Sequence, residues 1–322
     1  MGIYTVLGDA DLAAALQKWG LPPPDRVLPE PKGVMNTNYH LWSGGRRFFL
    51  RVSEGKSAAE LAFEVEVLRY LAEARFPVPV LVPAQGGAAD VEVAGRPAHL
   101  FGYAAGEELS AADVTPDACR RVGEQLARLH DLAAGFPGER ANPYGLERVR
   151  AWFADLGDGR GDAEVAAALP LFRDELARAA GLPGAPRGLV HGDLFRDNVL
   201  WIGGRVAAVL DWEMACTDAF ALDVGVALSA WCWGDGAFDG DRAAALLAGY
   251  RGKRRVEPET LAALAPWARF AALRFAVSRI HGYAWAPVGA DRLVKKDWRR
   301  YRDRLAALRA MGDEGFGALV KL

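Results

Sequence analysis

The chain has few residues of the types that build disulfide frameworks and zinc sites. Its 322 residues include only three cysteines, Cys119, Cys216 and Cys232, which are too few and too scattered for either. Proteins that keep isolated cysteines are typical of reducing compartments, so we expect a cytoplasmic protein.

The sequence also lacks a charge excess and a long apolar run. Its net charge is -2 and its pI is about 6.3, which argues against a nucleic-acid or anionic-membrane partner. There is no uninterrupted run of the roughly 18 apolar residues that a membrane span needs, and the N-terminus shows no basic flank followed by an apolar segment. Because 51% of the residues are apolar, the chain can bury a large core, which we expect to be divided between two lobes.

A predicted hairpin in the second half of the chain brings polar side chains together. Two apolar runs, 198–202 and 205–210, are joined by Gly203-Gly204, the signature of a two-residue turn. Antiparallel strands joined in this way pair their far ends. We therefore expect Asn198 and Asp211 to lie side by side.

Asp193 stands five residues before Asn198, in the loop that leads into this hairpin. An Asp there can orient a hydroxyl and accept its proton, while Asn198 and Asp211 hold Mg²⁺ against the phosphates of ATP. The spacing therefore predicts phosphoryl transfer with ATP as co-substrate and Mg²⁺ as cofactor. A surface loop with turn chemistry and a structural Asp is the plain alternative. A metallohydrolase built on His191, Asp193 and Asp211 is disfavoured, because the region has a single histidine.

The segment resembles the catalytic loop of the aminoglycoside phosphotransferase and choline kinase branch of the protein-kinase-like fold. Within that branch, the chain is most similar from end to end to bacterial homoserine kinases. The segments that carry this likeness are Tyr4-Thr5, Asp11-Leu12, Gly33–Tyr39, Asp193–Asn198, Ala215–Asp218, Asp223-Val224, Ala230–Cys232, Arg274–Arg279 and Lys296-Asp297. Three features depart from the homoserine kinase pattern: His191-Gly192, Asp211–Glu213 and Arg51. The first two are typical of the wider group of small-molecule kinases.

The resemblance implies an α+β, two-lobed fold. A small N-terminal nucleotide-binding lobe, residues 1–104, would hold an antiparallel sheet and a helix, with a hinge at about 101–106. A larger, mainly helical C-terminal lobe, residues 105–322, would hold the catalytic and substrate-binding residues. Helical periodicity and end signals predict further helices at about 147–156, 162–180, 219–233, 239–250, 258–281 and 295–310.

Two glutamates on a predicted helix, starting at Ser57 and ending near Ala74, differ in their expected roles. The helical phase places Glu64 within the apolar stripe and Glu66 roughly opposite. A carboxylate on an inward face needs a partner. In the kinase-like fold that partner is a basic residue that also contacts the phosphates, and Arg51 is the candidate. Alternatively, Glu64 is hydrogen-bonded at the lobe surface and Arg51 is exposed.

Four further residues are expected to contact the nucleotide. Asn36 and Asn38 belong to a strand-entry turn whose backbone N–H groups can lie over phosphates, although an ordinary turn would look similar. By analogy with the kinase hinge, the segment from Phe101 to Tyr103 would offer backbone groups to adenine.

The resemblance implies phosphorylation of L-homoserine to O-phospho-L-homoserine, a step of threonine biosynthesis. Asp218 or Asp223 could then contact the ammonium of the acceptor, and Arg274 or Arg279 its carboxylate. At a helix start, Asp223 could instead cap the helix or brace the catalytic loop.

Two other functions stay open. The first is another kinase of this fold, acting on choline, an aminoglycoside or another hydroxylated amine. A polycationic aminoglycoside is disfavoured because the chain has no dense acidic run. The second is a nucleotide-binding pseudokinase, disfavoured because Asp193, Asn198 and Asp211 are all present. The sequence does not define the oligomeric state.

Overall fold

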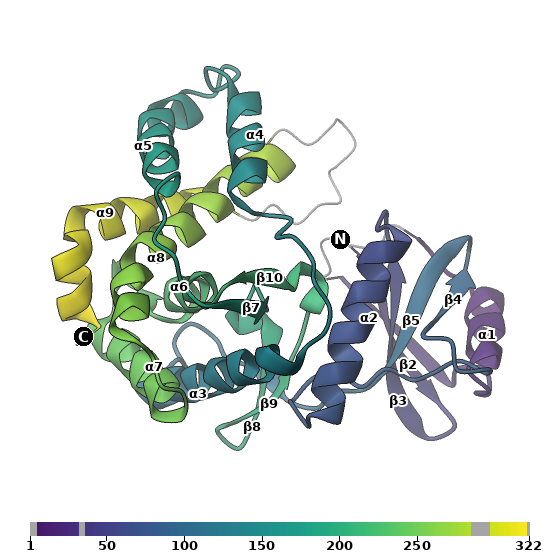
Figure 1. The fold of residues 1–322 in the computed structure, drawn as a ribbon. Helices are drawn as coiled ribbons and strands as arrows, with labels where there is room; N and C mark the ends of the chain where they lie inside the picture. The colour runs from purple at the N-terminus through teal and green to yellow at the C-terminus, as the bar shows by residue number, and fades with distance from the viewer. Residues whose placement is uncertain (1–4, 32–35, 285–296, 321–322) are drawn as a thin grey trace. The chain divides into compact units, whose positions relative to one another are not determined.

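The computed structural model describes residues 5–31, 36–284 and 297–320. They form two compact units, one ending at Ala105 and the other beginning at Gly106. Figure 1 traces the chain from the purple N-terminal elements to the yellow C-terminal helix. Antiparallel strands dominate the first unit and helices the second, which confirms the predicted α+β class.

The first unit is built on a five-stranded antiparallel sheet with the order β1-β2-β3-β5-β4. Its strands are β1 (Arg26–Glu30), β2 (Asn36–Ser43), β3 (Arg46–Ser53), β4 (Asp90–Val93) and β5 (Arg96–Gly102). Gly44 and Gly45 connect β2 to β3 with φ values of 57° and 73°, a conformation that glycine adopts without strain. Strand-like residues on both sides of the Gly44-Gly45 pair predict such a hairpin, and the structure confirms it from Asn36 onward. Residues 33–35 lie outside the described residues.

Two helices pack on opposite faces of this sheet. They are α1 (Asp9–Lys18) and α2 (Ala58–Glu73). Leu12 of α1 shares a buried core with Leu50 of β3. Arg51, the next residue of β3, bonds instead to Glu64 of α2. Because successive side chains of a strand point to opposite faces, α1 and α2 cover different sides of β3.

Helices fill most of the second unit (Figure 1). They are α3 (Pro116–Leu132), α4 (Leu146–Leu156), α5 (Ala163–Ala179), α6 (Phe220–Trp231), α7 (Gly240–Lys253), α8 (Pro258–Arg279) and α9 (Arg299–Leu319). The backbones of α3 and α7 approach closely at two glycines. A β-carbon on Gly123 would lie 2.0 Å from the carbonyl oxygen of Leu246, and one on Gly249 would lie 2.0 Å from that of Arg120. Glycine at these positions is therefore what allows the two helices to pack.

The apolar helix α8 runs through the core of the second unit. Among the described residues, the stretch Pro258–Gly282 is the one helix long and apolar enough to cross a membrane. However, 78% of its apolar window is buried inside the unit, and it packs against α5, α6 and α9. Burial on all sides explains an apolar composition around the whole helix.

Short strands hold the predicted hairpin in place. The small sheets consist of β7 (Arg187–Val190) with β10 (Cys216–Ala219), β6 (Glu107–Glu108) with β8 (Val199–Ile202) and β9 (Arg205–Val209), and β11 (Trp233–Gly234) with β12 (Ala237–Phe238). Gly203 and Gly204 join β8 to β9 with φ values of 54° and 72°. The predicted hairpin and its glycine turn are confirmed.

The last helix differs most from its predicted range of 295–310. It begins at Arg299 and continues to Leu319, with a kink at Gly312 (φ 69°, ψ 177°). The prediction stopped too early because a glycine commonly ends a helix, whereas here the chain bends at the glycine and resumes helical structure. Residues 295 and 296 lie outside the described residues.

Candidate active site

The loop between β7 and β8 brings Asp193 and Asn198 together. The amide Nδ2 of Asn198 donates to the main-chain oxygen of Asp193 at 2.7 Å and to its carboxylate Oδ2 at 3.2 Å. The Asp193 side chain keeps a small exposed area, since the residue is 9% exposed. Because the amide nitrogen of Asn198 is engaged in this way, its amide oxygen is the atom that remains for a metal ion.

Asp211 stands at the far end of the hairpin in a left-handed conformation, with φ 59° and ψ 68°. Aspartate is among the non-glycine residues that adopt this conformation most readily. Val199 pairs with Val209, and the Leu210 N–H donates to the Asn198 carbonyl at 2.8 Å. The ladder thus brings the start of β8 next to the end of β9, as the sequence predicted.

His191 supports the loop through both of its ring nitrogens. Nε2 donates to the Leu210 carbonyl at 2.9 Å, and Nδ1 accepts from the Asp193 N–H at 3.2 Å. Burial lowers the pKa of this imidazole, which is therefore neutral. With both nitrogens engaged, His191 is not available to a metal ion. No group of three or more His, Cys, Asp or Glu side chains forms a metal site within the described parts of the chain. The engagement of both nitrogens argues against a metallohydrolase built on His191.

Asp223, near the start of α6, holds the catalytic loop by its backbone. Its carboxylate accepts from the N–H groups of His191 at 2.9 Å and Gly192 at 2.8 Å. Burial alone would raise the pKa of Asp223, but its hydrogen bonds, that from His130 foremost, outweigh burial and lower the pKa, so the carboxylate stays ionised. Of the two roles expected for Asp223, the structure shows the brace for the loop. The contact with the acceptor ammonium is corrected, because the side chain is fully buried.

A buried polar chain links Asp223 to two further helices. His130 of α3 lies 3.3 Å from Asp223 Oδ2 through Nε2 and 2.7 Å from the Tyr250 hydroxyl of α7 through Nδ1. Burial lowers the pKa of His130, so the neutral ring donates to Asp223 and accepts from Tyr250. His130 is 1% exposed.

Arg274 of α8 holds the same loop from the other side. It is fully buried, and its guanidinium donates to the carbonyl oxygen of Gly192, whose N–H is bound by Asp223. Gly192 has a φ of 77°, which favours glycine. The expected contact between Arg274 and the acceptor carboxylate is corrected, because a side chain without exposed area cannot meet a dissolved ligand.

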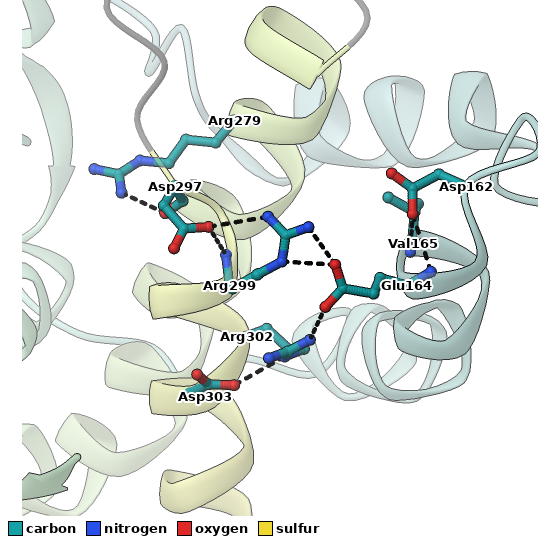
Figure 2. A network of polar contacts seen from close by, with 8 residues as sticks. All are labelled: Asp162, Glu164, Val165, Arg279, Asp297, Arg299, Arg302 and Asp303. Atoms are coloured by element: carbon teal, nitrogen blue, oxygen red, sulfur yellow. Dashed lines mark hydrogen bonds and ion pairs between the residues drawn. The ribbon is translucent and has the colours of Figure 1, made fainter.

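The other two expected acceptor residues differ in their surroundings. Asp218 is 6% exposed, and its carboxylate accepts from Asn142 Nδ2 at 2.7 Å and pairs with Arg187 at 3.2 Å. Its role within the unit is therefore structural. Arg279, at the end of α8, donates to the main-chain oxygen of Asp297 at 3.1 Å (Figure 2). Its guanidinium carbon lies 4.3 Å from the ring centre of Tyr301. Arg279 remains a candidate for contact with the acceptor carboxylate.

In the first unit, Glu64 is bound by two cations. Arg51 Nη1 lies 3.1 Å from one carboxylate oxygen of Glu64, and Lys56 Nζ lies 2.9 Å from the other. Glu64 is 7% exposed, whereas Glu66 is exposed, so the predicted helical phase and the predicted contact are both confirmed. The second cation was missed. Its signal was a lysine directly before the capping residue Ser57, close enough to reach the first turns of α2.

The expected phosphate and adenine contacts are in part corrected. Asn36 and Asn38 are buried within the sheet, where Asn36 Oδ1 accepts from the Glu54 N–H at 3.4 Å. Their backbones pair with Ser53 and Arg51 of β3, so the turn expected to lie over phosphates is part of a strand. Phe101 of β5 pairs with Phe49 of β3. The Tyr103 N–H donates to the Arg47 carbonyl at 3.2 Å. That N–H group is thus already used by the sheet, although the Tyr103 side chain is 38% exposed.

Comparison with known proteins agrees with this constellation. Residues 26–258 match the phosphotransferase enzyme family. Homoserine kinase from Methylorubrum populi is 35% identical over 97% of this chain and 98% of its own length, and that from Phenylobacterium zucineum is 37% identical over 97% of each.

Solved structures of kinases show the same fold. The amicoumacin kinase hAmiN, in complex with AMP-PNP, Ca²⁺ and Ami, has a TM-score of 0.68 at 17% identity, covering 90% of this chain and 89% of that chain. A choline/ethanolamine kinase family protein from Mesorhizobium loti has a TM-score of 0.66 at 19% identity, covering 98% of each chain. Together with the hydrogen-bonded pair of Asp193 and Asn198, the match over most of the sequence shows that the chain is a kinase that belongs to the phosphotransferase enzyme family.

Proposed function

We propose that the protein transfers the γ-phosphoryl group of ATP to the side-chain hydroxyl of L-homoserine, giving O-phospho-L-homoserine. The observation that carries this proposal is the likeness to homoserine kinases at 35–37% identity over 97% of the chain. The product would serve threonine biosynthesis in the cytoplasm.

Asp193 is proposed as the residue that orients the acceptor hydroxyl and accepts its proton. The hydrogen bond from Asn198 Nδ2 fixes the position of the carboxylate, and Asp223 and Arg274 fix the backbone of the loop that carries it. As the proton is lost, the hydroxyl oxygen attacks the γ-phosphorus, the bond from that phosphorus to the β–γ bridging oxygen breaks, and ADP leaves.

Asn198 and Asp211 are proposed as the protein ligands of Mg²⁺. One amide oxygen and one carboxylate suit this ion, which keeps several water ligands and binds substrate phosphates. When bound, Mg²⁺ supplies positive charge that neutralises the phosphate oxygens.

Arg51 is proposed to contact the phosphates of the nucleotide, with Glu64 holding its guanidinium in place. The buried ion pair at 3.1 Å supports this role. Lys56 shares Glu64 at 2.9 Å and is the second candidate for the same contact.

The test is ATP consumption by the purified protein with a panel of acceptors: L-homoserine, L-serine, L-threonine, choline and kanamycin. We expect kcat/KM to be highest for L-homoserine. Turnover of choline without turnover of homoserine would favour another kinase of this fold and leave the catalytic residues in place. No turnover of any acceptor, with ATP binding retained, would favour the pseudokinase.

A further inference from the structure

Several arginines of the second unit surround an aromatic cluster that includes the catalytic loop. The guanidinium carbons of Arg279 and Arg304 lie 4.3 Å and 4.6 Å from the ring centre of Tyr301. That ring lies 5.1 Å from Phe275 and 6.1 Å from Phe195, which stands two residues after Asp193. Tyr301 therefore holds both guanidinium groups near the loop that carries Asp193.

Among the residues that the structure describes, no acid forms an ion pair with these arginines. Within the described residues, Arg279 and Arg304 form no ion pair, and neither do Arg196 and Arg300, whose charges act on Arg304. Figure 2 shows the contrast on the same helix: Arg299 and Arg302 both pair with Glu164 of α5.

Burial increases the cost of this arrangement. The Nε atom of Arg304 is buried and has no hydrogen-bond partner within the described residues, and Arg279 is 8% exposed. Burial, followed by the positive charges of Arg279, Arg300 and Arg196, lowers the pKa of Arg304. An arginine nevertheless keeps its proton in proteins, so the repulsion persists until an anion binds.

Contacts between cation and ring hold these guanidinium groups next to aromatic side chains. Arg304 lies over Tyr301 and also 5.5 Å from the ring centre of Trp233. A guanidinium held by its face presents its N–H groups at the edge, where a carboxylate can accept two parallel hydrogen bonds.

We propose that Arg304 and Arg279 bind the α-carboxylate of the amino-acid acceptor. This inference rests on the proposed function, and it adds Arg304 of α9 as a residue that determines specificity. An acceptor bound in this way would have its hydroxyl at Asp193 and its carboxylate at Arg304, on the side of the loop where Phe195 contacts Tyr301. The same hydroxylated amine without a carboxylate would lack this anchor.

The experiment compares L-homoserine with 3-amino-1-propanol, which has the same ammonium and hydroxyl groups but no carboxylate. Arg304→Met and Arg304→Lys are tested beside Arg302→Met, a matched control on α9 whose arginine pairs with Glu164 and Asp303. Thermal unfolding verifies that each variant is folded.

Arg304→Met should raise the KM for homoserine by roughly 10- to 100-fold, the scale of a charge-assisted hydrogen bond. Its KM for ATP and its kcat/KM for 3-amino-1-propanol should stay within about twofold of the parent, because neither involves the carboxylate. Arg304→Lys should recover part of the loss, and Arg302→Met should behave as the parent.

Equal losses with both acceptors, or a rise in the KM for ATP instead, would overturn the carboxylate assignment while homoserine kinase activity of the parent stands. A parent enzyme that uses other acceptors but not homoserine would overturn the proposed function itself, and this inference with it.

Discussion

Asp193 is the residue whose removal should separate chemistry from binding. We expect Asp193→Ala to lower kcat by roughly 10²- to 10⁴-fold, the scale of general-base catalysis, and to leave ATP affinity nearly unchanged. Steady-state kinetics and calorimetric titration with ATP measure the two quantities. Asp197→Ala is the matched control, since Asp197 is an exposed acid in the same loop. A variant of Asp193 that kept more than half of the parent's activity would rule this residue out as the base.

Glu64 and Glu66 offer a second comparison between neighbouring residues of one helix. Glu64→Gln should raise the KM for ATP, because the neutral amide releases Arg51 and Lys56 from their positions. Glu66→Gln should change nothing, since Glu66 is exposed. Initial rates at varied ATP concentration test both variants, and effects of equal size would contradict the proposed role of the ion pair.

Sequence reasoning assigned one role to Glu64 but left two roles open for Asp223, and the reason is physical. Helical periodicity defines the inward face of α2, so the phase alone distinguishes Glu64 from Glu66. The partners of Asp223 are backbone groups 31 and 32 residues earlier in the chain, which no local pattern encodes. Arg274 likewise reaches a carbonyl 82 residues away.

At the scale of elements, the neutral ring of His130 links α3, α6 and α7 through hydrogen bonds to Asp223 and Tyr250. Its pKa is lowered in the folded protein, so below the unfolded-state value of about 6.5 only the unfolded chain binds a proton on this histidine. The contribution of neutral His130 to the free energy of unfolding is therefore complete above that pH. It is lost as the pH falls towards the folded-state pKa of His130.

Urea unfolding of the parent should therefore show a lower free energy of unfolding at pH 5.5 than at pH 7. His130→Gln should lose less over the same interval, by up to about 1.4 kcal/mol per pH unit for one group. A variant whose loss matched that of the parent would show that His130 does not contribute to the pH dependence.

The close approach of α3 and α7 depends on glycine. In Gly123→Ala the new methyl group would lie 2.0 Å from a backbone oxygen, so the helices must separate. We expect the free energy of unfolding to fall by about 1–3 kcal/mol, the typical cost of an extra methyl group in a well-packed core. Gly252→Ala is the control on α7, because nothing lies within 4 Å of its β-carbon. That change should be neutral or stabilise by up to about 1 kcal/mol, and denaturant unfolding compares the two.

At the scale of the whole molecule, the acceptor must reach from a charged anchor to Asp193. Homoserine has one methylene more than serine between its α-carbon and its hydroxyl. With its carboxylate held in the same place, serine should fall short of in-line geometry, and a misplacement of about 1 Å can cost on the order of 10²-fold. We therefore expect kcat/KM for homoserine to exceed that for serine by at least this factor, measured by ATP consumption. Comparable values would show that the anchor and the base are not separated by a fixed distance.

The arrangement of the whole chain was more predictable than its detailed contacts. Alternating apolar residues and paired glycines identified the hairpins at Gly44-Gly45 and Gly203-Gly204, because these signals are local. The kink at Gly312 and the burial of Asn36 depend on what packs around them, and the sequence pattern was compatible with other outcomes.

The two contacts that hold the backbone of Gly192, from Asp223 and from Arg274, affect how an enzyme of this kind can change during evolution. Asp223 accepts from the N–H of Gly192, and Arg274 donates to its carbonyl. Replacing a neighbouring side chain leaves both of these backbone groups in place. The placement of the loop is therefore largely independent of the side chains at Phe195 and Arg196. A scaffold with this separation can acquire a new acceptor through a few surface substitutions, without rebuilding the catalytic loop.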